Sequence, residues 1–126
     1  MPDYSLPQGS KGTIPTEDAT QQTANWRAYL AGSDLITKAF LFPIETFRNL
    51  IASNPEADGI RVYLGLKTAG DPESLTALLV PVIDGNDIVV APKTAPGDGD
   101  GDDDDNVYNF SQTCPPICDN NSPLGE

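Results

Sequence analysis

The sequence predicts an α+β fold in which two helices lie on one face of a mostly antiparallel sheet of about four strands. Two segments carry apolar residues at helical spacing, and the segments around them are rich in β-branched and aromatic residues or alternate between apolar and polar side chains. Apolar residues are concentrated between Trp26 and Val90, whereas both ends are polar and rich in turn-forming residues. We therefore expect a compact core between extended N- and C-terminal arms.

Composition divides the chain into four parts. Residues 1–15 form an extended arm, 16–92 the α+β core domain, 93–106 an acidic Gly/Asp linker and 107–126 a C-terminal tail. A chain of 126 residues is long enough for one domain with its own hydrophobic core.

The first helix is predicted to begin near Thr16, which offers a capping oxygen, and to stop near Gly32. Glu17 and Asp18 would lie in its first turn, where carboxylates suit the positive end of the helix dipole. Trp26 would anchor this helix, and its indole N–H then needs an acceptor.

A second helix is predicted between Pro43, which suits a first turn, and Pro55, which ends it. Residues at i, i+3, i+4 and i+7 would form its inner face: Phe47, Leu50, Ile51 and Asn54.

Strands account for the rest of the core. Residues 35–42 are rich in β-branched and aromatic side chains, and residues 60–67 alternate as a half-buried strand does. The inner face of the second segment would carry Ile60, Val62, Leu64 and Leu66, and the solvent face Arg61, Tyr63 and Lys67. That solvent face is also a candidate binding patch.

Two more strands complete a predicted meander. Residues 74–84 are apolar on both faces, but Pro81 has no N–H for a ladder, which favours an edge strand or a bulge. The Asp-Gly-Asn-Asp segment at 84–87 predicts a hairpin turn, and residues 87–92 provide a short partner strand.

The formal net charge of −12 excludes some classes of partner. A nucleic-acid backbone would be repelled, because affinity for it comes from Lys and Arg. No apolar run approaches the roughly 18 residues of a membrane span, so we expect no membrane insertion. Histidine is absent, which excludes Ser-His and Cys-His nucleophile systems.

The acidic run at 98–105 contains six aspartates and has two interpretations. Calcium takes six to eight oxygens, and the alternating Asp98, Asp100, Asp102 and Asp104 are candidate ligands. The run departs from an EF-hand loop, because Asp103 stands where that loop has glycine and Asn109 where it has glutamate. Blocks of like charge are more often solvated linkers, which is the interpretation we favour.

The tail offers two further candidate features. Val107, Tyr108 and Phe110 are interaction candidates, because they are able to add a strand to an exposed sheet edge on the same molecule or on another. Cys114 and Cys118 are too few ligands for a structural zinc site. Both a local disulfide and a reduced pair remain open, and an oxidised pair would argue for a place outside the cytosol.

Five segments resemble a family of small bacterial proteins that pair a Trp-Arg helix with a C-terminal Cys-Pro-Pro-x-Cys motif. They are NWRAYL (25–30), AFLFPIETFRNLI (39–51), GIRVYLGLK (59–67), LLVPVID (78–84) and CPPICDNNSPL (114–124). The resemblance covers roughly residues 25–124 and implies no activity and no catalytic residues. It implies that core and tail belong to one unit.

The sequence thus favours a non-catalytic interaction or self-assembly module whose arms pair with neighbouring subunits, with no required cofactor. One alternative is a calcium-responsive extracellular module that uses the loop 98–105, and another is a metal-dependent hydrolase. The start of the chain shows no signal peptide, so we expect a cytoplasmic protein, with leaderless export as the alternative.

Overall fold

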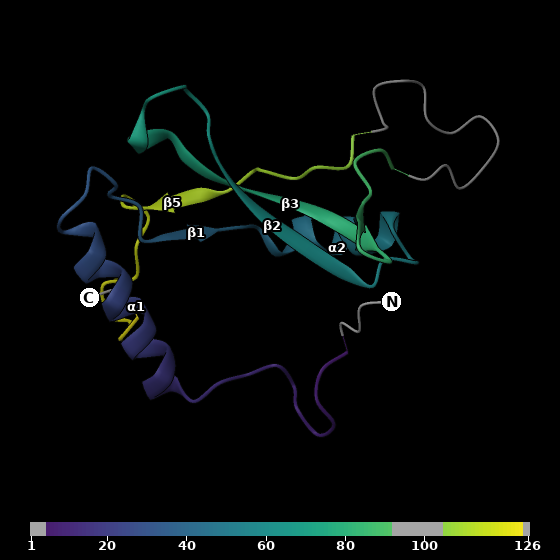
Figure 1. The fold of residues 1–126 in the computed structure, drawn as a ribbon, viewed down its shortest axis with the longest axis horizontal. Coiled ribbons are helices and arrows are strands. Elements are labelled where there is room, and N and C mark those ends of the chain that lie inside the picture. Colours follow the sequence, from purple (N-terminus) through teal and green to yellow (C-terminus); the bar gives the residue numbers. More distant parts are fainter. Residues whose placement is uncertain (1–4, 92–104, 125–126) are drawn as a thin grey trace. The chain divides into compact units, whose positions relative to one another are not determined.

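The computed structural model describes residues 5–91 and 105–124 (Figure 1). Its elements are α1 (Thr16–Leu30), β1 (Ala39–Leu41), α2 (Ile44–Ser53), β2 (Gly59–Leu66), the 3-10 helix η1 (Pro72–Ser74), β3 (Leu75–Ile83), β4 (Asn86–Asp87) and β5 (Gln112–Cys114). The strands form one sheet in the order β1-β5 and another in the order β2-β3-β4. The α+β class and the antiparallel pairing are confirmed, with the strands divided between two sheets.

The chain folds into two compact units whose segments alternate along the sequence. In the described part, the first unit comprises 42–65, 77–91 and 105–111, and the second comprises 5–41, 66–76 and 112–124. Residues from both of the segments that composition assigns to arms therefore belong to compact units.

The second unit contains α1 and the two-stranded sheet. Trp26 acts as predicted, since its Nε1 donates to the carbonyl of Thr37 at 3.0 Å. Pro15 occupies the N-cap of α1 and no side chain caps the helix, so the prediction that Thr16 supplies the cap is wrong. The cause is the fixed φ of proline, which sets the entry to the helix one residue earlier.

The strand predicted at 35–42 is shorter than expected, because β1 covers only Ala39–Leu41. Its partner β5 is also short, and the register pairs Ala39 with Cys114 and Leu41 with Gln112. The Lys38 N–H donates to the carbonyl of Cys114 at 2.6 Å and extends the pairing by one bond. The composition of 35–42 predicts a longer strand than β1. In the structure β1 extends only over the three residues that pair with β5.

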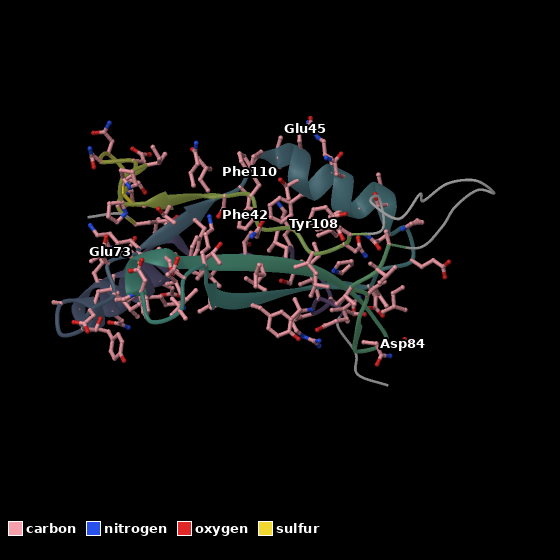
Figure 2. All side chains as sticks on the ribbon, turned by 90° about the horizontal axis from the view of Figure 1, so that it is seen from above. Phe42, Glu45, Glu73, Asp84, Tyr108 and Phe110 are labelled. Atoms are coloured by element: carbon pink, nitrogen blue, oxygen red, sulfur yellow. A yellow bond between two sulfur atoms is a disulfide. The ribbon has the colours of Figure 1, made fainter. Side chains whose placement is uncertain are left out.

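The first unit contains α2, β4 and most of β2 and β3, and its core forms around β3. Leu50 of α2 and Val80 of β3 are each only 1 % exposed. Tyr108, which is labelled in Figure 2, pairs with Leu79 of β3 in an antiparallel bridge. Pro43 is the N-cap of α2, one position before the first turn that the sequence predicts for it.

Pro81 lies in a central strand, so of the two predicted alternatives, an edge strand or a bulge, the edge strand is wrong. On the side of β3 away from β2, Leu79 exchanges two backbone hydrogen bonds with Tyr108, and the carbonyl of Pro81 accepts from the N–H of Ile88 at 2.9 Å. β3 therefore changes partner from Tyr108 to β4 at Pro81, and a missing N–H is tolerated at that point.

The predicted hairpin turn between β3 and β4 is confirmed. Asp84 and Gly85 both have positive φ, 52° and 84°, which is the pattern of a type I′ turn. The turn positions Asp87 opposite Val82 in the register of the two strands.

Candidate interaction site

The apolar face of β2 is largely exposed, although its alternating sequence predicts a buried face. Ile60, Val62 and Leu64 are 40 %, 57 % and 66 % exposed, respectively, so that prediction is wrong for this strand. Alternation shows which side chains share a face, but it does not show whether another element covers that face. Here the core gathers on β3, whereas β2 lies at the side of the sheet.

The outer edge of β2 is unpaired in the part of the chain that the structure describes, because the strand order is β2-β3-β4. Natural edge strands are usually protected by Pro, Lys, bulges or a covering element. β2 has the sequence Gly-Ile-Arg-Val-Tyr-Leu-Gly-Leu, which contains no proline and Arg61 as its one charged residue. Among residues 5–91 and 105–124, no strand pairs with this edge.

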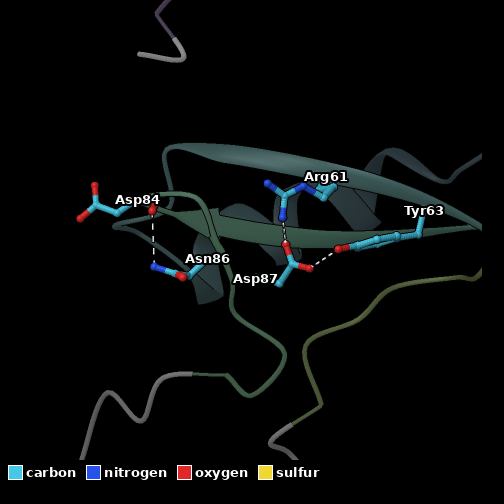
Figure 3. Close-up of polar contacts among 5 residues, drawn as sticks. All are labelled: Arg61, Tyr63, Asp84, Asn86 and Asp87. Atoms are coloured by element: carbon cyan, nitrogen blue, oxygen red, sulfur yellow. Dashed lines mark hydrogen bonds and ion pairs between the residues drawn. The ribbon is translucent and has the colours of Figure 1, made fainter. Parts of the chain in front are cut away.

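A polar cluster occupies the opposite face of the same sheet (Figure 3). Asp87 of β4 accepts hydrogen bonds on both carboxylate oxygens, from Nη1 of Arg61 on Oδ1 and from Oη of Tyr63 on Oδ2. Arg61 and Tyr63 thus reach across β3, which separates β2 from β4. Of the three residues predicted on the solvent face, Arg61 and Tyr63 therefore share one carboxylate, and Lys67 takes no part in these contacts.

The hydrogen bond with Tyr63 and the charge of Asp87 raise the pKa of Arg61 above its ordinary value. A raised pKa means that the stabilising charge is present at every lower pH and is lost only as the pH rises through the raised value. The guanidinium of Arg61 therefore stays charged near neutral pH, and its ion pair with Asp87 is not lost by deprotonation of Arg61.

Two shallow depressions adjoin the start of β2 in the first unit. One, of about 310 Å³, lies between the C-terminal end of α2 and β2, with Leu50, Ile51 and Ile60 in its lining. The other, of about 410 Å³, is lined by residues of 58–62 and by Val82. Both include Gly59 and Ile60, so the exposed apolar row of β2 continues into hollowed surface on which another side chain can pack.

A buried pair of amides attaches the chain after the acidic run to the first unit. Asn54 and Asn106 are 3 % and 1 % exposed and exchange hydrogen bonds of 3.0 and 2.9 Å. Asn106 also donates to the carbonyl of Ile88 at 2.7 Å and accepts from the hydroxyl of Tyr108 at 3.2 Å. The sequence gives one hint of this pair, since Asn54 falls on the predicted inner face of α2; composition places Asn106 in the linker.

The predicted calcium ligands Asp98, Asp100, Asp102 and Asp104 lie outside the described residues. Val90 and Asp105, on either side of the acidic segment, form an antiparallel bridge. The two ends of the segment are therefore side by side in the first unit. Within 5–91 and 105–124, no group of three or more His, Cys, Asp or Glu residues is arranged to hold a metal ion.

Of the predicted interaction candidates, Tyr108 pairs with Leu79 of its own chain. Val107 and Phe110 are 44 % and 71 % exposed. The isolated bridge at Tyr108 uses the side of β3 that faces away from β2. Of the two edge strands of this sheet, β2 is the long one, with 8 residues against 2 in β4.

Cys114 and Cys118 form a disulfide in the second unit, with their Cα atoms 4.9 Å apart. Among the helices described, none has the length and apolar character needed to cross a membrane. No protein-family model, curated protein or solved structure matches the chain, so the resemblance to the bacterial Cys-Pro-Pro family stays a prediction.

Proposed function

We propose that this chain is a non-catalytic protein-interaction module that binds an extended partner segment along the outer edge of β2. One observation carries the proposal: an unpaired edge strand presents Ile60, Val62 and Leu64 half-exposed on one face. Strand addition at such an edge supplies main-chain hydrogen bonds, and pockets for alternate side chains supply specificity.

The free energies of burial, hydrogen bonding and association together indicate a weak, reversible interaction. Burying a fully exposed Val, Ile or Leu contributes about 1.5–3 kcal/mol, so covering three half-exposed side chains contributes roughly 3 kcal/mol. Each main-chain hydrogen bond adds about 1 kcal/mol net. Association costs at least about 4 kcal/mol. We therefore expect dissociation constants in the micromolar to millimolar range.

A peptide titration tests the proposal. The probe is a synthetic decapeptide of alternating valine and lysine, added to isotope-labelled protein at about 150 mM salt to screen the net charge. The control is a peptide of the same composition with valines and lysines in separate blocks. We expect amide chemical-shift changes concentrated at 59–66 with the alternating peptide alone. Equal changes with both peptides, or changes elsewhere, would contradict the proposal.

A calcium-responsive extracellular module is the second candidate. The Cys114–Cys118 disulfide supports it, because disulfides persist mainly in oxidising compartments. The bridge between Val90 and Asp105 also supports it, since it closes the acidic segment into a loop. Calorimetry with calcium chloride tests it directly. Heat of binding up to millimolar calcium that disappears in a variant without residues 93–103 would favour this candidate.

A further inference from the structure

We infer that the partner at the β2 edge is a second copy of this chain, with the two β2 strands paired antiparallel around Val62. The inference rests on the proposed function and adds the identity of the partner and the register. A twofold axis through Val62 would join the three-stranded sheets of two copies into one continuous sheet, and closed twofold symmetry is the commonest form of association between identical chains.

The alternation of β2 restricts the register. In an antiparallel pair, directly opposed residues lie on the same face of the sheet. The exposed apolar row meets its copy only when even-numbered residues oppose even-numbered residues. With Val62 opposite Val62, Ile60 lies opposite Leu64 of the second copy, and three exposed apolar side chains from each copy become neighbours.

The charge on β2 selects among the registers that remain. Pairing around Arg61 would oppose two guanidinium groups, which destabilises a sheet. Pairing around Tyr63 would leave Arg61 opposite Gly65. Pairing around Val62 places Arg61 opposite Tyr63 of the second copy on both sides of the axis, so each Arg61 has an aromatic residue and no like charge as its directly opposed neighbour.

The distribution of charge also favours β2 as the contact between two copies. Two copies that each carry a net charge of −12 repel one another. β2 contains no Asp or Glu. Asp87, which lies over its polar face, has both carboxylate oxygens occupied by Arg61 and Tyr63. β2 is therefore a place where two copies approach with little repulsion between carboxylates.

The hollow beside β2 offers room for the second copy. In the Val62-centred register, Leu64 of the second copy lies opposite Ile60, which lines the depression of about 310 Å³ next to Ile51. Leu64 is the most exposed side chain of the apolar row, at 66 %. The same contact occurs twice by symmetry, so each copy supplies a leucine to the surface beside the other copy's Ile60.

Cysteine cross-linking tests the register. Both native cysteines are joined in one disulfide, so Val62→Cys introduces a thiol that has no competing free thiol. Val89→Cys is the matched control, because Val89 lies outside β2 and is 56 % exposed against 57 % for Val62. We expect Val62→Cys to form a linked species of twice 13.4 kDa at least about tenfold faster than Val89→Cys in mild oxidation. Ile60→Cys and Leu64→Cys should link slowly alone and rapidly when mixed.

Light scattering of the full chain from about 5 to 500 µM supplies a second readout. We expect the mass of the unmodified chain to rise with concentration, Val62→Lys to remain monomeric, and Val89→Lys to behave as the unmodified chain, with circular dichroism confirming that each is folded. A constant monomer mass, or cross-linking at Val62 no faster than at Val89, overturns the inference. If the alternating peptide still shifts residues 59–66 in that case, the proposed function stands; if it does not, both are rejected.

Discussion

At the scale of single residues, the most informative side chains are two amides. Asn54 and Asn106 are buried, and together they take part in contacts with one another, with the carbonyls of Leu50 and Ile88 and with Tyr108. A buried polar group that is fully hydrogen-bonded specifies one arrangement, because any other arrangement leaves it unpaired. The pair therefore determines where the chain returns after the acidic segment.

Replacing Asn106 by alanine tests this role. The change removes four hydrogen bonds and leaves the amide of Asn54 partly unpaired in the core, so we expect a loss of about 2–4 kcal/mol in the free energy of unfolding. Urea denaturation measures it. Asn109→Ala, at an exposed position close by, is the control and should change stability by less than about 0.5 kcal/mol. An equal loss of stability in the two variants would show that the hydrogen bonds of the Asn54–Asn106 pair contribute no more than an exposed side chain does.

At the scale of elements, periodicity and turn chemistry predict most of what forms. The two helices, the alternating strand β2, the long strand β3 and the Asp84–Gly85 turn all lie close to their predicted places. These features depend on local backbone preferences, which a sequence carries directly.

The features that sequence reasoning missed all depend on neighbours. The exposed face of β2, the central position of Pro81 and the buried Asn106 are decided by which element lies alongside. The polar cluster is similar, because Asp87 is far from Arg61 in sequence and meets it only through the strand order. The sequence therefore allows the residue types of the candidate site to be predicted, but it does not allow their exposure to be predicted.

The connection between Val90 and Asp105 gives a prediction at this scale. Val90 and Asp105 are already paired, so the acidic residues between them are not needed to bridge two distant parts of the first unit. Replacing 93–103 by a short Gly-Ser-Gly linker should leave the first unit folded. Each halving of a flexible loop lowers its closure cost by about 0.6 kcal/mol, and the loss of charge repulsion acts in the same direction. Thermal unfolding measures the change, and a large loss of stability would contradict the closed-loop interpretation.

At the scale of the whole molecule, the net negative charge opposes the association of two copies, whereas the exposed apolar row of β2 favours it. Six aspartates in 98–105 supply half of the net charge of −12, whereas the inferred contact is apolar or has its carboxylate paired. Added salt screens the repulsion and leaves apolar contacts largely unaffected, since the Debye length falls from about 30 Å at 0.01 M to about 10 Å at 0.1 M.

We therefore expect the fraction of paired chains to rise between about 10 and 300 mM sodium chloride at constant protein concentration. Sedimentation velocity measures this fraction. The Val62→Lys variant should show no such rise, because it places a charge on the contact itself. A fraction that falls with salt would mean that ion pairs hold the copies together, which would contradict an apolar strand pairing.

The alternation of the two units along the sequence has a consequence for synthesis. β1 occupies residues 39–41, but the strand that completes its sheet is β5 at 112–114. While the intervening residues emerge from the ribosome, β1 has no partner within its own sheet, and its pairing closes only near the end of translation. Non-local pairing of this kind is slow to form. No single cut of the chain frees either unit intact, so a truncated fragment would carry pieces of both.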